Sequence, residues 1–266
     1  MALLILTCVV ALVVFRFQHE VKAGYDYAGR KVAPVRTWML PVPQMYRDIL
    51  QKYFRYYQAL SASDKARFER KVCNFLYSKH FIPRNMPKVP IEARVLIAAS
   101  AVQLTFGLPD NYLQHFDKIL VYPDEYYSLI TRQYHKGEVN PRFGIIVLSW
   151  NHFLEGYINT RDSVNLGLHE MAHALRLENV IRSGDYKFFD EDLVTKLDEY
   201  ALNICRNPES YEHFFRPYAC TNEHEFFSVA VENFFERSEH FKKQIPDLYI
   251  ILTRLLGQDP LKLAAA

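Results

Sequence analysis

The chain has 266 residues, half of them hydrophobic and 15% aromatic, with 32 Lys and Arg against 30 Asp and Glu. This length and composition supply enough apolar material for one large core, which predicts a single catalytic domain. The formal charge of +2, without a long run of basic residues, argues against nucleic acid as a direct partner.

An apolar segment at residues 1–17 predicts an N-terminal membrane anchor. The segment is short beside the about 20 apolar residues that a bilayer core requires, although a snorkelling Arg16 extends its reach. A buried core helix is the alternative, whereas a cleaved signal peptide would begin with a basic residue. Basic residues follow the segment, so the positive-inside rule predicts a catalytic domain facing the cytoplasm; a soluble cytoplasmic protein is the alternative. They are Arg16, at the end of the segment, and Lys22, Arg30 and Lys31 after it.

Prolines and a shortage of helix formers predict a linker at 18–40, which leaves 41–262 for the catalytic domain. Two short segments rich in Ile, Val and Leu, 118–122 and 143–150, predict a small sheet ahead of a helix at 165–180. Segments with apolar and charged residues at helical spacing lie before and after these two strands in the sequence. The other predicted helices are 45–57, 62–80, a very apolar and therefore buried 91–106, 193–205, 225–237 and 247–256. The pattern predicts an α+β fold, rich in helices.

The cysteines are far apart along the chain and form no C-x-x-C pair. This spacing predicts buried or unreactive thiols, and neither a disulfide framework nor a cysteine zinc site. The four residues are Cys8, Cys73, Cys205 and Cys220.

The strongest chemical signal is the segment His169-Glu170-Met171-Ala172-His173. Residues four apart on an α-helix differ by about 40° around its axis, so both histidines can bind one metal ion. Glu170 would lie beside the open side of the metal and act as general base on a bound water. Asn165 is a candidate N-cap, and no proline interrupts the helix. The segment predicts one Zn²⁺ per chain.

A catalytic zinc needs a third protein ligand, and no H-x-x-G-x-x-H pattern continues the motif after His173. A carboxylate on a later helix is the remaining source. Glu225 is favoured because it begins an aromatic-rich helix, although Asn222-x-x-Glu225 is also a capping-box pattern. The residues alone leave eight candidates: Asp190, Glu191, Asp192, Asp198, Glu199, Glu223, Glu225 and Glu232.

Four segments in the same order resemble the Mlc titration factor A family of zinc peptidases. They are 147–150 (VLSW), 168–175 (LHEMAHAL), 218–227 (YACTNEHEFF) and 258–261 (QDPL). The third also resembles the catalytic domain of anthrax lethal factor. The likeness covers about 41–261, and it implies a zincin-like metallopeptidase domain.

The resemblance implies roles for three further residues. Glu225 matches the family's third metal ligand, and Tyr218 matches a tyrosine that stabilises the oxyanion. Glu232 matches a glutamate that orients a histidine of the metal site. Met171 replaces the family's usual Phe, a swap that nearly conserves volume.

Together these features predict a membrane-tethered zinc peptidase of the aminopeptidase or oligopeptidase type, which acts on peptide or protein substrates. An edge strand at 143–148 is expected to pair with an extended substrate. The alternative is a regulatory binding protein that sequesters a transcriptional repressor or another protein partner, with peptidase activity secondary.

Overall fold

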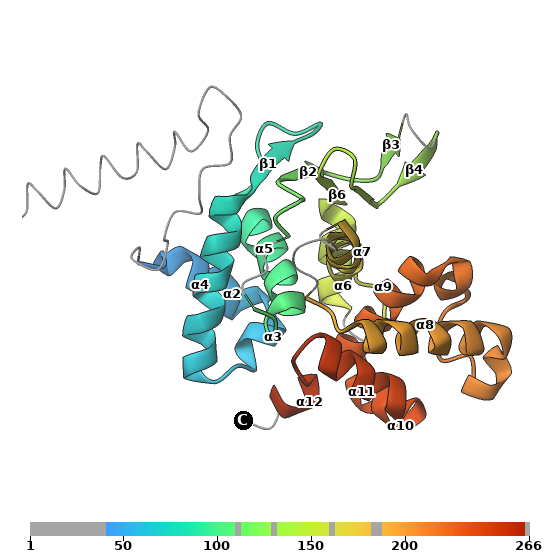
Figure 1. Ribbon diagram of the computed structural model, residues 1–266. Coiled ribbons are helices and arrows are strands. Elements are labelled where there is room, and N and C mark those ends of the chain that lie inside the picture. The colour runs from blue at the N-terminus through green and yellow to red at the C-terminus, as the bar shows by residue number, and fades with distance from the viewer. Residues whose placement is uncertain (1–40, 110–112, 129–131, 160–162, 182–187, 264–266) are drawn as a thin grey trace, which may run out of the picture. The chain divides into compact units, whose positions relative to one another are not determined.

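The computed structural model describes residues 41–109, 113–128, 132–159, 163–181 and 188–263 (Figure 1). Contacts group the chain from Val42 onward into one compact unit. The predicted anchor and linker lie outside the described residues, so the domain boundaries stay a prediction. Within the described ranges, no helix combines the length and the apolar character needed to cross a bilayer.

The first helices of the domain differ from prediction at one point. The predicted helix 45–57 is divided at Phe54, whose extended backbone (φ −116°, ψ 95°) directs a ring only 1% exposed into the core. Burial of this ring outweighs helix continuity, which sequence periodicity cannot reveal. The helix predicted at 91–106 is buried as expected. The four helices are α2 (Gln44–Tyr53), α3 (Arg55–Gln58), α4 (Ala62–Ser78) and α5 (Ile91–Thr105).

A four-stranded mixed sheet precedes the metal helix, as predicted, in the order β1-β2-β6-β5. The first three strands are parallel, and β5 is antiparallel to β6. The expectation of an edge strand at 143–148 is wrong, because β6 has a neighbour on each side and β5 forms the edge. A separate hairpin joins β3 to β4. The strands are β1 (His80–Pro83), β2 (Lys118–Tyr122), β3 (Tyr126–Ser128), β4 (Gln133–His135), β5 (Gly137–Asn140) and β6 (Ile145–Ser149).

Helices make up the rest of the domain, and the helix-rich α+β class is confirmed. The predicted helices at 165–180, 193–205, 225–237 and 247–256 are all present within three residues of their expected ends. The α-helices are α6 (Trp150–Ile158), α7 (Leu166–Ile181), α8 (Glu191–Arg206), α9 (Glu223–Glu236), α10 (Ser238–Gln244), α11 (Pro246–Leu255) and α12 (Pro260–Leu263); two 3₁₀ turns are η2 (Pro208–Tyr211) and η3 (Pro217–Thr221).

Helix α7 packs against both helices and strands. It contacts α5, α6 and α9, and also the strands β5 and β6 (Figure 1). Its apolar side chains Leu168, Ala172 and Leu175 are buried in the main core, as their spacing predicts. Because both sides of α7 are packed, the residues of its polar face are held in fixed directions.

The expectation that all cysteines are free thiols is wrong. Cys205, near the end of α8, and Cys220, in η3, form a disulfide with a Cα–Cα distance of 5.5 Å. The two residues are 15 apart in sequence, and the fold of α8 back onto η3 brings them together, so no local motif marks the pair. Cys73 is a free, buried thiol, as expected.

Candidate metal centre

Helix α7 presents His169 and His173 to the same side. Asn165 precedes its first turn, and its side-chain Oδ1 accepts a hydrogen bond from the backbone N–H of Leu168 at 3.0 Å, as an N-cap does. The two Nε2 atoms lie 3.1 Å apart, which is the convergence that the four-residue spacing predicts.

Helix α9 brings Glu225 to the two histidines. Its Oε2 lies 3.1 Å from His169 Nε2 and 3.2 Å from His173 Nε2. Asn222 caps α9 by accepting hydrogen bonds from the backbone N–H groups of His224 and Glu225, both at 2.9 Å. The cap fixes the first turn of α9, so Asn222 orients Glu225 through the backbone and leaves its carboxylate directed at the histidines.

These three side chains fit a metal ion. Tetrahedral bonds of about 2.0–2.2 Å place neighbouring ligand atoms about 3.3–3.6 Å apart, close to the separations found here. Oε2 of Glu225 is buried and has no hydrogen-bond partner among the described residues. With both Nε2 atoms deprotonated, the three groups would direct lone pairs at one point, an arrangement that a cation stabilises. Within the part of the chain that the structure describes, His169, His173 and Glu225 form the one such cluster of potential ligands.

Glu232 is a buried carboxylate that lies on the Nδ1 side of His169, away from the other ligands. Its Oε1 lies 2.6 Å from Nδ1 of His169, and because a carboxylate can only accept, Nδ1 carries the proton and Nε2 is free for a metal. Arg216 donates to both oxygens of Glu232, at 2.7 Å and 3.2 Å. The backbone N–H of Asn165 donates to Oε2 at 2.7 Å, so the cap of α7 and the histidine share one carboxylate.

The electrostatics of the cluster favour positive charge. Burial would lower the pKa of His169, but the neighbouring carboxylates Glu225 and Glu232 raise it to about 10. Burial would likewise raise the pKa of Glu225, yet the two histidines hold it well below its usual range. A divalent ion bound at this point would supply the positive charge that the carboxylates stabilise.

Glu170 lies next to His169 and is buried between α7 and the sheet. Burial raises the pKa of its carboxyl group, while the nearby His169 and His173 oppose that rise. A carboxylate so desolvated is a stronger base than one in water, which suits proton abstraction.

Tyr218 lies in η3, on the side of the cluster that faces solvent. It is 50% exposed, and its ring centroid is 6.1 Å from that of His169. Burial and the charge of Glu225 raise the pKa of its phenol to about 12, so the hydroxyl keeps its proton at neutral pH. The disulfide at Cys220 ties this turn to α8.

Comparison with known proteins agrees with this geometry. The family of glucose-regulated metallo-peptidases M90 matches residues 33–256 of the chain. The chain belongs to the M90 family. An uncharacterized protein of Synechocystis sp. is 28% identical over 240 residues, which cover 83% of this chain and 86% of the relative.

The M90 chain is also similar to proteins named Mlc titration factor A. The one from Pectobacterium atrosepticum is 25% identical over 224 residues, or 76% of this chain and 82% of its own. The one from Yersinia pestis is 25% identical over 222 residues, or 76% and 80%. The predicted resemblance to this family is therefore confirmed.

The other carboxylates considered as ligands in this M90 domain have different surroundings. Asp190 caps α8, and Asp198 binds Arg176 at 2.7 Å. Glu232 faces Nδ1 of His169 and not the point where the Nε2 atoms converge. The remaining candidates are exposed to solvent and outside the cluster: Glu191, Asp192, Glu199 and Glu223.

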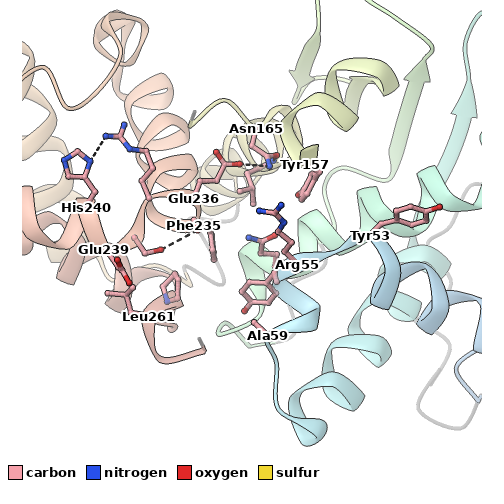
Figure 2. A pocket seen from close by; sticks show the side chains of 16 residues that line it. Tyr53, Arg55, Ala59, Tyr157, Asn165, Phe235, Glu236, Glu239, His240 and Leu261 are labelled. Atoms are coloured by element: carbon pink, nitrogen blue, oxygen red, sulfur yellow. Dashed lines mark hydrogen bonds between the residues drawn. The ribbon is translucent and has the colours of Figure 1, made fainter. Parts of the chain in front are cut away.

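One cavity of the M90 domain, about 660 Å³, does not include the metal cluster in its lining. It is lined by residues of α3, α9, α10 and α12, with Asn165 and Glu236 at one side (Figure 2). Asn165 Nδ2 donates to Glu236 Oε1 at 3.0 Å. The cavity therefore borders the metal site at Asn165, whose backbone N–H binds Glu232, and at Leu168, which precedes His169.

Sequence reasoning missed two residues of the M90 site. No sequence pattern marks Arg216 as a site residue, because an arginine before a proline occurs in many structural contexts. Gly137 lies outside the two predicted strand segments, and the structure places it in β5 beside Glu170. A glycine inside a strand is a signal of close approach, but this strand was not predicted.

Proposed function

We propose that the chain is a zinc-dependent peptidase of the aminopeptidase or oligopeptidase type. The single observation that carries this proposal is the convergence of His169, His173 and Glu225 beside the buried carboxylate of Glu170. Two imidazoles and one carboxylate are ligands typical of catalytic zinc, which keeps a fourth position for water. Membership of a metallo-peptidase family supports the same reaction class.

In this reaction, His169, His173 and Glu225 would hold the ion, and Glu232 would keep His169 in the tautomer that binds. When bound, zinc lowers the pKa of a water toward about 7 and polarises the scissile carbonyl. Glu170 would accept the proton of the attacking water and pass it to the leaving amine. Tyr218 donates its hydroxyl proton in a hydrogen bond to the oxyanion that develops.

The proposed substrate is an extended peptide that pairs with β5. This strand ends the four-stranded sheet, so its outer edge can accept and donate backbone hydrogen bonds. Gly137 in β5 lies beside Glu170, which would bring a paired backbone close to the general base. Substrate pairing is thus assigned to β5 in place of 143–148.

The direct test is metal analysis of the purified protein together with digestion of a peptide library. We expect about one zinc per chain and cleavage that a chelator abolishes and added zinc restores. Bond positions in the products distinguish removal of terminal residues from internal cleavage. A metal-free parent protein, or a zinc-loaded parent that cleaves no peptide, would contradict the proposal.

A second function is supported by the names of the relatives that are called Mlc titration factor A. In this alternative, the chain captures a transcriptional repressor or another regulatory protein. Capture that survives Glu170→Gln, without any metal-dependent cleavage, would favour binding over catalysis.

We also propose that residues 1–17 anchor the protein to a membrane, with the catalytic domain facing the cytoplasm. The support is the apolar composition of this segment and the basic residues that follow it. Release of the full-length protein by a carbonate wash would contradict the anchor.

A further inference from the structure

Gly137 begins the edge strand β5 and lies against the side chain of Glu170. A Cβ atom added to Gly137 would lie 2.6 Å from Cδ and 2.7 Å from Cγ of Glu170, and would also overlap Oε1. Carbon atoms in contact are normally about 3.5–4.0 Å apart. Any side chain at residue 137 therefore competes with the Glu170 carboxylate for the same space.

The backbone of Gly137 does not require a glycine. Among the described residues, the glycines with positive φ are Gly144 and Gly257, and Gly137 is not one of them. Alanine can adopt the backbone of an ordinary strand and favours strands at least as well as glycine does. The requirement at this position is therefore for space, and the three nearest atoms that set it all belong to Glu170.

The strand cannot move away easily to make that space. Gly137 is in register with Leu148 of β6, and the backbone N–H of Ser149 donates to the carbonyl of Lys136 at 2.8 Å. The next residue, Glu138, accepts a hydrogen bond from the hydroxyl of Tyr126 at 2.9 Å. Since the strand is held on both sides of Gly137, the flexible side chain of Glu170 is the part that would shift.

We propose that Gly137 is a positioning residue, whose lack of a side chain lets the Glu170 carboxylate lie between α7 and β5, next to His169 of the metal cluster. This inference rests on the proposed function for the role of Glu170. A larger residue at 137 would displace the general base without touching the ligands. A misplacement of about 1 Å in a reacting group can reduce turnover about 10²-fold.

The test is a double-mutant cycle with Gly137→Ala and Glu170→Ala. We expect Gly137→Ala to lower kcat about 10²-fold with KM and zinc affinity within about 2-fold of the parent, because no ligand or substrate contact is removed. Beside Glu170, the added methyl should also lower the melting temperature by about 2–4 °C, a shift that modest strain produces in a domain of this size.

Glu170→Ala removes all three atoms that the added Cβ would meet, so it is the matched background. There, Gly137→Ala should no longer lower the melting temperature. Equal shifts in both backgrounds, or a kcat of Gly137→Ala within about 2-fold of the parent, would overturn the inference. If the parent cleaves no peptide, the proposed function fails, and the melting temperatures still decide whether residue 137 and Glu170 exclude each other.

Discussion

Oε1 of Glu232 lies 2.6 Å from Nδ1 of His169, on the opposite side of the imidazole from Glu225. One histidine thus separates two glutamates of the same helix, and only Glu225 reaches the point shared with His173. The two acids, seven residues apart on α9, therefore have different expected roles.

The first prediction compares Glu225→Ala with Glu232→Ala. Loss of Glu225 removes a charged ligand, so we expect zinc and peptidase activity to be lost together. Loss of Glu232 removes the partner that orients His169, so zinc affinity should fall about 10 to 100-fold and excess metal should restore occupancy. Zinc titration measures both. A larger affinity loss in Glu232→Ala would show that the ligand assignment is wrong.

The second prediction concerns Glu170→Gln. The amide keeps the shape of the side chain and can still hydrogen-bond water, but it cannot take a proton. Peptidase activity should fall by about 10² to 10⁴-fold, the usual contribution of a general base, at unchanged zinc content. Activity and bound zinc are measured on the same preparation. Retained turnover would favour the binding function.

The third prediction concerns Arg216, which binds Glu232 through two nitrogens and the carbonyl of Ser163 through Nη1 at 2.6 Å. The Glu232 side chain is 1% exposed and that of Arg216 is 29% exposed, so water compensates only partly for a lost partner. Arg216→Ala should lower the free energy of unfolding by about 1–3 kcal/mol, measured by urea denaturation, and weaken zinc binding.

The matched control for Arg216→Ala is Arg67→Ala. Arg67 pairs with Asp64 at 3.1 Å, but its side chain is 53% exposed and that of Asp64 is 36% exposed. Such surface pairs contribute about 0–1 kcal/mol, so this variant should unfold almost as the parent does and keep its zinc. If the two variants lose equal free energy of unfolding and zinc affinity, Arg216 has no particular role at the metal site.

The fourth prediction concerns the Cys205–Cys220 disulfide. A bridge that closes a loop of this length stabilises by about 3 kcal/mol in the chain-entropy description. The double variant Cys205→Ser and Cys220→Ser should lose about that much free energy of unfolding. Reductant should lower the stability of the parent to the same level and leave the variant unchanged. A parent insensitive to reductant would contradict the bridge.

The fifth prediction concerns Gly257, whose φ is +62° and whose added Cβ would meet the carbonyl oxygen of Gly107 at 2.6 Å. Both features oppose a side chain, and the neighbour that must move is backbone. Gly257→Ala should destabilise the fold by about 1–3 kcal/mol in urea denaturation. Zinc content should not change, since Gly257 lies outside the cluster.

Helix α7 and its two histidines could be predicted from the sequence, because the pattern that indicates them is local. The spacing of His169 and His173, the cap at Asn165 and the apolar residues between them all depend on one helical period. The third ligand was different. Spacing left eight acids open. The aromatic-rich helix and the resemblance both favoured Glu225, but neither could show the approach of α9 to α7, which is a tertiary contact.

The structural features that the sequence did not predict all depend on tertiary contacts. Phe54 divides a helix because the core accepts its ring, and β5 forms because β6 offers it a partner. The pairing of Cys205 with Cys220 depends on how α8 returns to η3. None of these is encoded by a residue's immediate neighbours, so periodicity and motifs could not reveal them.

The Cys205–Cys220 bridge allows the proposed membrane orientation to be tested by thiol chemistry. Glutathione and thioredoxin keep cytosolic thiols reduced, whereas bridges persist on the oxidising side of a membrane. The basic residues after the apolar segment favour the cytosolic side, so the two signals oppose each other. Alkylation of intact cells followed by mass measurement therefore reports orientation: a bridged chain has its catalytic domain outside the cytosol, and a chain with both thiols alkylated has it inside.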